Sequence, residues 1–168
     1  MLEIVVLVHN IRSTFNVGSI LRTSDGFGIR KVIFSGYTPY PSVENDTRLP
    51  FEREKLDKQI EKTALGATEF VDFEHSSSVF DVIARLRDDG FKIFALEQDS
   101  SSTKLADFTD VKPENGKVAL LLGEEVTGIS ADLLKLMDMI LEIPMVGRKE
   151  SFNVASAFAV AVWEMVRR

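Results

Sequence analysis

The 168 residues are enough for one domain with a substantial core, and 45% apolar with 27% charged residues excludes a disordered or fibrous chain. The absence of cysteine excludes disulfides, thiol nucleophiles and cysteine-rich metal sites, and it is compatible with the cytosol. The formal net charge of −6 excludes a protein that coats nucleic acid non-specifically, so any nucleic-acid partner must be met by a local basic patch.

Neither a secretory signal nor a membrane span is expected. The apolar run near the N-terminus, residues 3–8, is too short for the core of a signal peptide and lacks basic flanks. No stretch of about 18 residues is free of polar groups, as a helix that crosses a membrane requires. The sequence therefore predicts a cytoplasmic protein.

Short apolar runs predict six β-strands. The first and the fifth are apolar at nearly every position, which is typical of strands covered on both faces. In chain order, the expected strands span residues 2–8, 31–35, 69–73, 91–96, 117–122 and 139–143. Two connections are long: residues 36–50, which contain tyrosines and prolines and read as a mobile loop, and the polar residues 97–115.

Five helices are expected, each with a recognisable start or stop. Asn16 and Ser78 are small polar residues that suit N-caps, and Gly28, Gly66 and Gly90 suit the position just past a helix C-terminus. In chain order, the helices span residues 17–27, 51–65 and 78–89, a short segment capped by Ser130, and a long buried segment that begins near Ser151.

This alternation of apolar strands and helices predicts an α/β fold, with a mostly parallel sheet and helices on both faces. Neither an internal repeat nor a domain linker interrupts it. Ligands of such sheets bind beyond the carboxyl ends of the strands. The loops that follow residues 8, 96, 122 and 143 are therefore the expected location of a site.

The familiar signatures of other α/β enzymes are missing. Gly26-Phe27-Gly28 resembles part of a dinucleotide fingerprint, but it follows a helix and lacks the third glycine. The sequence has neither a P-loop nor a Gly-x-Ser-x-Gly nucleophile elbow. Of the two histidines, His75 is expected to be solvated and His9 to form a hydrogen bond at the end of a strand.

What remains is a set of small polar, charged and glycine residues that follow three of the strands: Asn16 and Arg22, then Gly123, Glu124, Glu125 and Gly128, then Ser151 and Asn153. On one helix, Asn16 and Arg22 would point about 120° apart, so they converge only if Asn16 lies outside the helix at its cap. Ser151 reads as an N-cap in preference to a site residue, whereas Asn153 lies inside an apolar run.

Three motifs carry a family resemblance: residues 16–25 (NVGSILRTSD), residues 122–130 (LGEEVTGIS), and residues 143–145 (IPM) followed by 151–154 (SFNV). Together, and in this order, they resemble the SpoU/TrmH family of RNA 2′-O-ribose methyltransferases, which have the SPOUT fold. The resemblance covers nearly the whole chain. It implies a C-terminal trefoil knot, which sequence rules alone would not predict because true knots are very rare. It also implies S-adenosylmethionine bound in the knot, and a homodimer.

The resemblance further implies roles for individual residues. The cofactor would be held by Leu96, Gly123, Glu124, Ile143, Met145, Ser151, Phe152 and Asn153. Arg22, with Asn16 and Asn153 holding the geometry, would serve catalysis, and Glu125 and Gly128 would fix the second motif loop. The cations that flank this site, and are therefore the expected RNA contacts, are Arg12, Arg22, Arg148 and Lys149.

The implied reaction is transfer of a methyl group to a ribose 2′-hydroxyl in tRNA or rRNA, without a metal. A guanidinium has a pKa above about 12, so Arg22 is expected chiefly to orient the nucleophile. The alternatives are a SPOUT enzyme that methylates a base, and a catalytically silent RNA-binding relative. We expect residues 1–168 to be a single catalytic domain without a separate RNA-binding extension. Two positions depart from many relatives: Glu124 replaces a neutral polar residue and Phe152 replaces a leucine.

Overall fold

The computed structural model describes residues 2–124 and 127–167. Its centre is a seven-stranded sheet in the order β3-β2-β1-β6-β4-β7-β5, and all its strand pairs are parallel. The strands are β1 (Glu3–His9), β2 (Lys31–Ser35), β3 (Asp72–Ser76), β4 (Lys92–Leu96), β5 (Thr103–Lys104), β6 (Lys117–Leu122) and β7 (Met139–Glu142). The predicted α/β class with a parallel sheet is confirmed.

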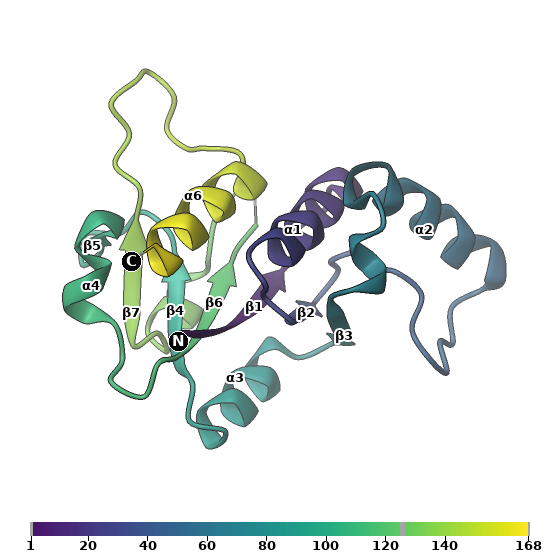
Figure 1. Cartoon of the computed structure of the whole chain (residues 1–168), viewed down its shortest axis with the longest axis horizontal. Coiled ribbons are helices and arrows are strands. Elements are labelled where there is room, and N and C mark those ends of the chain that lie inside the picture. The colour runs from purple at the N-terminus through teal and green to yellow at the C-terminus, as the bar shows by residue number, and fades with distance from the viewer. Residues whose placement is uncertain (1, 125–126, 168) are drawn as a thin grey trace.

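Helices cover both faces of this sheet (Figure 1). They are α1 (Thr14–Gly26), α2 (Pro50–Ala64), α3 (Val79–Asp88), α4 (Phe108–Val111), α5 (Ala131–Leu134) and α6 (Val154–Val166), with 3₁₀ turns at Ala67–Glu69 and Leu105–Asp107. Buried side chains of α1, α2, α4 and α6 form one core cluster, and those of α3 and α5 form the other.

Strands β1 and β6 lie side by side near the centre of the sheet, and both of their faces are therefore buried. Along β1, Val6 and Val8 pack with the first cluster and Val5 and Leu7 with the second, as the period of two in a strand requires. From β1 the chain winds outward to β2 and β3, and it then crosses to the other side of β6 to form β4. The strand order therefore reverses between β1 and β6, and ligands bind at such switch points in open α/β sheets.

Two strands differ from the prediction, and both lie at the edges of the sheet. The two-residue β5 falls within the polar segment expected to be a connection, and it adds a seventh strand to the predicted six. Strand β3 begins at Asp72 rather than at Glu69, because a 3₁₀ turn occupies Ala67–Glu69. An edge strand needs only one partner and can be polar, so the apolar pattern gives little signal there.

Two helix caps also differ from the prediction. Helix α1 begins three residues earlier than expected, with Ser13 as N-cap accepting from the backbone N–H of Asn16 at 3.3 Å, so Asn16 lies within the first turn. At α6, Asn153 is the N-cap and accepts from the N–H groups of Ala155 and Ser156, whereas Ser151 precedes the helix. The caps expected at Ser78 and Ser130 are confirmed.

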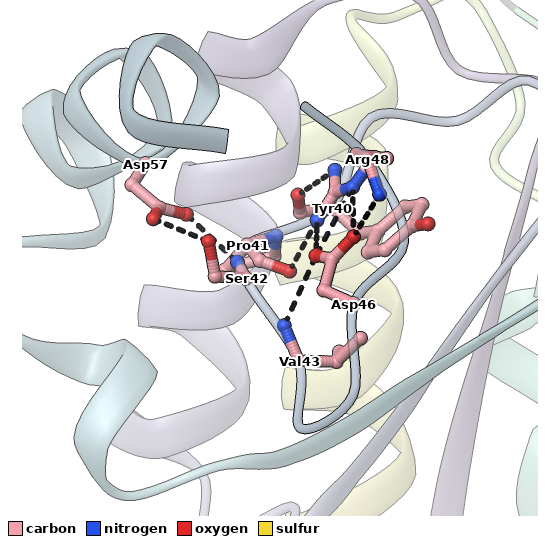
Figure 2. A network of polar contacts seen from close by, with 7 residues as sticks. All are labelled: Tyr40, Pro41, Ser42, Val43, Asp46, Arg48 and Asp57. Carbon is pink, nitrogen blue, oxygen red and sulfur yellow. Dashed lines mark hydrogen bonds and ion pairs between the residues drawn. The ribbon is translucent and has the colours of Figure 1, made fainter. Parts of the chain in front are cut away.

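The loop between β2 and α2, residues 36–49, is held by a dense set of contacts (Figure 2). The ring of Tyr40 is sandwiched between His75, at 4.1 Å between ring centroids, and the guanidinium of Arg48, at 3.7 Å. Arg48 also pairs with Asp46 and donates to the carbonyl oxygens of Tyr40 and Pro41. These contacts contradict the expectation of a mobile loop, and they show that His75, which also bonds to the Gly36 carbonyl, is not simply solvated.

In the described part of the chain, no helix combines the length and the apolar character needed to cross a bilayer. The trefoil knot stays a prediction. The strand order is compatible with a chain that doubles back through its C-terminal region, since β4 lies between β6 and β7.

Candidate active site

A pocket of about 290 Å³ lies beyond the carboxyl ends of β4, β6 and β7, where the sequence placed the site. Its volume is near the lower end of small-molecule pockets, which span about 300–1,000 Å³. Three loops and the first turn of α6 form its walls. The lining residues are Leu96, Glu97, Gln98, Leu122, Gly123, Glu124, Thr127, Gly128, Ile143, Glu150, Ser151, Phe152, Val154 and Ala157.

The structure gathers most of the residues that were expected to hold a cofactor. Leu96, Gly123, Glu124, Ile143, Ser151 and Phe152 all line the pocket. Met145 and Asn153 do not, although both lie on the segment that forms one wall. Gly128, expected to have a structural role, also lines it, whereas Glu125 lies outside the described residues.

The two glycines of the second motif allow close backbone approaches. A Cβ on Gly123 would lie 2.3 Å from Cγ1 of Ile129, and Gly128, at φ +69°, would place a Cβ 2.5 Å from Oε2 of Glu97. The side chain of Glu97 is the reason for this crowding. Its carboxylate accepts from the backbone N–H of Ile129 at 3.0 Å and from that of Gln98 at 2.9 Å. Glu97 therefore joins the exit of β4 to the loop after β6.

Sequence reasoning missed seven pocket residues: Glu97, Gln98, Leu122, Thr127, Glu150, Val154 and Ala157. One signal could have found Glu97, because it is the first residue after a buried strand whose carboxyl end was already singled out. Ala157 was noted only as part of an alanine-rich helix. Its small side chain leaves room for the pocket, which no periodic pattern reports.

The segment between β7 and α6, residues 143–153, closes the pocket with few contacts of its own. The amide of Gln98 donates to the carbonyl oxygen of Glu150 at 2.7 Å. At its end, Nδ2 of Asn153 donates to Oδ1 of Asn16 at 3.1 Å, which joins the first and third motifs. Before these points, the side chain of Val146 is fully exposed. This contact between Asn16 and Asn153 holds the start of α6 against α1.

Arg22 lies away from this contact. It is an exposed residue of α1, and Asn16 is in the same helix, so the two side chains point about 120° apart. The convergence that a capping Asn16 would have allowed is therefore absent. Within residues 2–124 and 127–167, Arg22 makes neither a hydrogen bond nor an ion pair. Arg148 and Lys149 are exposed in the β7–α6 segment, beside the pocket.

A polar cluster borders the pocket on the side of β1 and β2. The carboxylate of Glu124 accepts from Thr127 and from Arg12, the latter at 3.2 Å. The hydroxyls of Thr127 and Tyr37 lower the pKa of Glu124, and Arg12 lowers it further, so Glu124 is held as a carboxylate. Nearby, burial lowers the pKa of His9, and the charge of Glu124 opposes this in part.

A second hollow, of about 430 Å³, lies between the β2–α2 loop and α2. Its carboxylates are already engaged. Asp57 accepts from the backbone and hydroxyl of Ser42, and Glu61 accepts from the N–H of Gly66 and the hydroxyl of Thr68. The bonds of Asp57 hold the loop to α2, and those of Glu61 hold the turn that follows α2, so both carboxylates of the hollow are engaged by the fold, while Lys58 also lines it.

Comparison with known proteins identifies the family of the chain. The sequence model of the SpoU rRNA Methylase family matches residues 3–163. The tRNA (guanosine(18)-2′-O)-methyltransferase of Escherichia coli K12 is 25% identical to the chain, over 99% of this chain and 64% of its own length. The enzyme of the same name from Borreliella burgdorferi is 28% identical, over 99% of this chain and 65% of its own length. The chain thus spans just under two thirds of these relatives.

Solved structures share the fold. The A. aeolicus TrmH/SpoU tRNA modifying enzyme superposes with a TM-score of 0.77 at 21% identity, over 98% of this chain and 74% of that one. The SpoU methyltransferase AviRb from Streptomyces viridochromogenes superposes with a TM-score of 0.73 at 25% identity, over 97% and 58%. With the family match over residues 3–163 and the three motifs around one pocket, the chain belongs to the SpoU rRNA Methylase family.

Proposed function

We propose that the chain catalyses methylation of a ribose 2′-hydroxyl in tRNA or rRNA, with S-adenosylmethionine as methyl donor. The observation that carries this proposal is the pocket, because segments from the second and third motifs form its walls and Asn16 of the first bonds to Asn153 beside it. The names of the relatives support the reaction, since two of them are tRNA (guanosine(18)-2′-O)-methyltransferases. AviRb has also been solved in complex with AdoMet.

The pocket fits this donor in chemical character. Leu96, Ile143 and Val154 offer apolar surface for a flat adenine ring, and Gly123 lets Ile129 pack closely against the backbone of the pocket wall. Glu150, Ser151 and Thr127 offer oxygen atoms to the polar amino acid portion. When bound, the donor supplies an electrophilic methyl group on a positively charged sulfur.

The chain's own residues would position the acceptor. In the transfer step, a bond forms between the 2′-oxygen and the methyl carbon as the bond between sulfur and that carbon breaks. The hydroxyl proton is released to solvent. Asn16 and Asn153 hold the start of α6 and thus one wall of the site. Arg22 would orient the acceptor and its phosphate, because a guanidinium is a poor base but a good donor of paired hydrogen bonds.

The position of Arg22 favours a site completed by a second copy of the chain. Arg22 points away from Asn16, so in one subunit it does not face the pocket. The outer face of α6 supports a homodimer, since Val160 and Trp163 lie one turn apart and Trp163 is 59% exposed. An exposed tryptophan beside an exposed valine is typical of a protein–protein interface. Replacing Trp163 with glutamate should shift the protein toward the monomer in light scattering.

RNA binding would rest on the few cations beside the pocket, Arg12, Arg148 and Lys149, together with Arg22. Each phosphate contact contributes about 0.9 or less to the slope of log affinity against log salt, so four cations limit that slope to about 4 per subunit. Such a protein would work in the cytoplasm, where tRNA and rRNA are found. The predicted trefoil knot belongs to the same proposal.

The test is transfer of labelled methyl groups to unmodified tRNA and rRNA, followed by digestion to nucleosides. After digestion to nucleosides, we expect the label in a 2′-O-methylnucleoside. After alkaline hydrolysis instead, we expect it in a dinucleotide, because a methylated 2′-oxygen cannot attack the neighbouring phosphate. Label in a base would contradict the ribose assignment. An Arg22→Ala variant should lose the maximal single-turnover rate but keep cofactor affinity; if it only needs more RNA, Arg22 is a phosphate contact.

A further inference from the structure

Helix α2 carries a row of lysines on its outer face. At about 100° per residue, Lys55, Lys58 and Lys62 lie within about 60° of one another around the helix, and the buried Ile60 lies on the opposite side. All three lysines are exposed. With a rise of about 1.5 Å per residue, their Cα atoms span about 10 Å along the helix axis. The three side chains therefore form one stripe, which we call the lysine stripe.

The charges of the lysine stripe are not neutralised by the helix itself. Within residues 2–124 and 127–167, none of the three lysines forms an ion pair. The four carboxylates of α2 lie to the sides, about 70° or more from the middle of the stripe. Two of them, Asp57 and Glu61, are engaged with Ser42 and with the turn after α2. The stripe is thus a local concentration of positive charge on a chain whose formal net charge is −6.

Close packing fixes α2 against α1. A Cβ on Gly18 of α1 would lie 2.2 Å from the carbonyl oxygen of Ile60 and 2.2 Å from Oγ1 of Thr63, so the two helices approach very closely. The hydroxyl of Thr63 also donates to the carbonyl oxygen of Phe15 at 2.9 Å. The lysine stripe therefore has a fixed position relative to the first turn of α1, and no ligand is needed to order it.

The C-terminal end of the lysine stripe is linked to the border of the pocket. Thr63 is next to Lys62, and Phe15, to which Thr63 bonds, is next to Asn16, whose side chain bonds to Asn153 beside the pocket. Figure 1 shows α2 beyond α1, on the side away from α6. A polymer that reaches the pocket across the first turn of α1 can therefore continue along the stripe.

A row of exposed lysines fits the sugar–phosphate backbone of RNA. Phosphate contacts come largely from lysine and arginine, and they fix orientation without reading sequence. Lysine is depleted at protein–protein interfaces, so a protein is the weaker fit. The same face of α2 exposes Leu65 at one end and Phe51 at the other, and an aromatic ring can stack on any base.

On these observations, and resting on the proposed function for the identity of the polymer, we propose that the lysine stripe binds the phosphate backbone of the substrate RNA outside the pocket. It supplements the four cations beside the pocket, and it holds the RNA without taking part in methyl transfer. Three further phosphate contacts raise the limit of the salt slope from about 4 to about 6 per subunit.

The test is binding of fluorescein-labelled, unmodified tRNA, measured by anisotropy without cofactor between about 50 and 200 mM KCl. Lys55→Gln, Lys58→Gln and Lys62→Gln are combined in one variant, because glutamine is a good helix former. We expect this variant to bind about tenfold more weakly at the lowest salt, with a slope lower by about 2–3. An affinity and a slope equal to those of the parent would overturn the proposal and leave an acidic protein surface as the partner.

A matched variant removes the same charge elsewhere. Lys92, Lys112 and Lys135 are exposed lysines at the start of β4, after α4 and after α5. Their combined replacement by glutamine also removes three positive charges, and it should leave tRNA affinity within about twofold of the parent, because salt screens remote charges. An equal loss of affinity in both triple variants would indicate a general charge effect and overturn the role of the stripe.

Cofactor titration and methyl transfer keep this proposal distinguishable from the proposed function. The α2 variant should bind S-adenosylhomocysteine as the parent does, because none of the pocket residues lies on α2. In methyl transfer, it should raise the KM for RNA and leave kcat unchanged. RNA binding that depends on the stripe, without methyl transfer by the parent, would remove the methyltransferase proposal and leave the stripe. Methyl transfer with an unchanged KM in the α2 variant would remove the stripe and leave the methyltransferase.

Discussion

Two loops at the same edge of the sheet, residues 36–49 after β2 and residues 143–153 after β7, are built in opposite ways. The first is held by its own side chains, with Arg48 at the centre of a network that includes Asp46 and the Tyr40 ring (Figure 2). In the second, Ile143 packs against the core at the start, the hydrogen bonds among the described residues lie near the end, at Glu150 and Asn153, and the middle is exposed.

This difference indicates a division of labour. A loop that satisfies its own polar groups keeps one shape whether or not a ligand is present. A loop with few internal contacts gains order when a ligand fills the space beneath it, and it pays that ordering cost on binding. We therefore expect the cofactor to order residues 143–153 and to leave residues 36–49 unchanged.

The largest effect should come from filling the space beneath the second loop. Ala157→Leu places a larger side chain in the pocket wall, and leucine is a good helix former, so α6 should persist. We expect the affinity for S-adenosylhomocysteine, measured by calorimetry, to fall by about 100-fold or more, equivalent to about 2.7 kcal/mol.

Ser156→Leu is the control for this variant, because it introduces the same side chain at an exposed position of the same helix that does not line the pocket. It should bind the ligand as the parent does. Equal affinities for Ala157→Leu and the parent would show that the ligand does not use this pocket. Gly123→Val is a poorer test, since its Cβ would already contact Ile129.

A smaller effect is expected from loosening the anchor of the second loop. Asn153→Ala removes the N-cap of α6 and the bond to Asn16, so the free energy of unfolding should fall by about 1–2 kcal/mol in urea denaturation. Ser151→Ala, two residues away and outside the helix, should change it by less than about 0.5 kcal/mol. Equal losses in the two variants would contradict the assignment of Asn153 as the cap.

Breaking the network of the first loop should have a local effect. Arg48 keeps the pKa of Asp46 well below its usual range, and the side chain of Asp46 is almost inaccessible to solvent. Asp46→Asn removes the charge of this pair, so amide hydrogen exchange should become faster by about tenfold or less within residues 36–49 and stay unchanged in residues 143–153. A uniform increase over the whole chain would indicate global destabilisation instead.

Mild acid should produce the smallest change in stability, and it should act through His9, close to the first loop. Burial lowers the pKa of His9 below its ordinary value of 6.5, and His9 bonds to Ser35 just before that loop. The unfolded chain therefore takes up a proton first as the pH falls through 6.5, and stability declines from there to the folded pKa. His9→Gln should flatten the pH dependence of the melting temperature between about pH 7 and 5. An unchanged slope would exclude His9 as its cause.

The contrast between centre and edges also shows what the sequence reveals. Strands β1 and β6 could be predicted because burial on both faces leaves continuous apolar runs. Strand β5 could not, because two polar edge residues leave no such run. The caps were displaced because several small polar residues stand within one turn of each other: Ser13 near Asn16, and Ser151 near Asn153.

The candidate site followed the same rule. The sequence predicted site residues at Gly123, Ile143 and Ser151, because they follow strands whose carboxyl ends meet at one edge of the sheet. Glu97 and Ala157 could not be predicted from their neighbours in sequence, because Glu97 matters through its bond to the backbone of Ile129 and Ala157 through the space that its small side chain leaves. The direction of Arg22 could not be decided either, since it depended on whether Asn16 was the cap or part of the helix.

The most direct test of this account is amide hydrogen exchange of the whole chain with and without saturating S-adenosylhomocysteine. We predict slower exchange in residues 96–98, 122–124, 127–128 and 143–153, around the pocket, and unchanged exchange in residues 36–49. Unchanged exchange around the pocket, or protection confined to the hollow between the β2–α2 loop and α2, would contradict the assignment of the cofactor site.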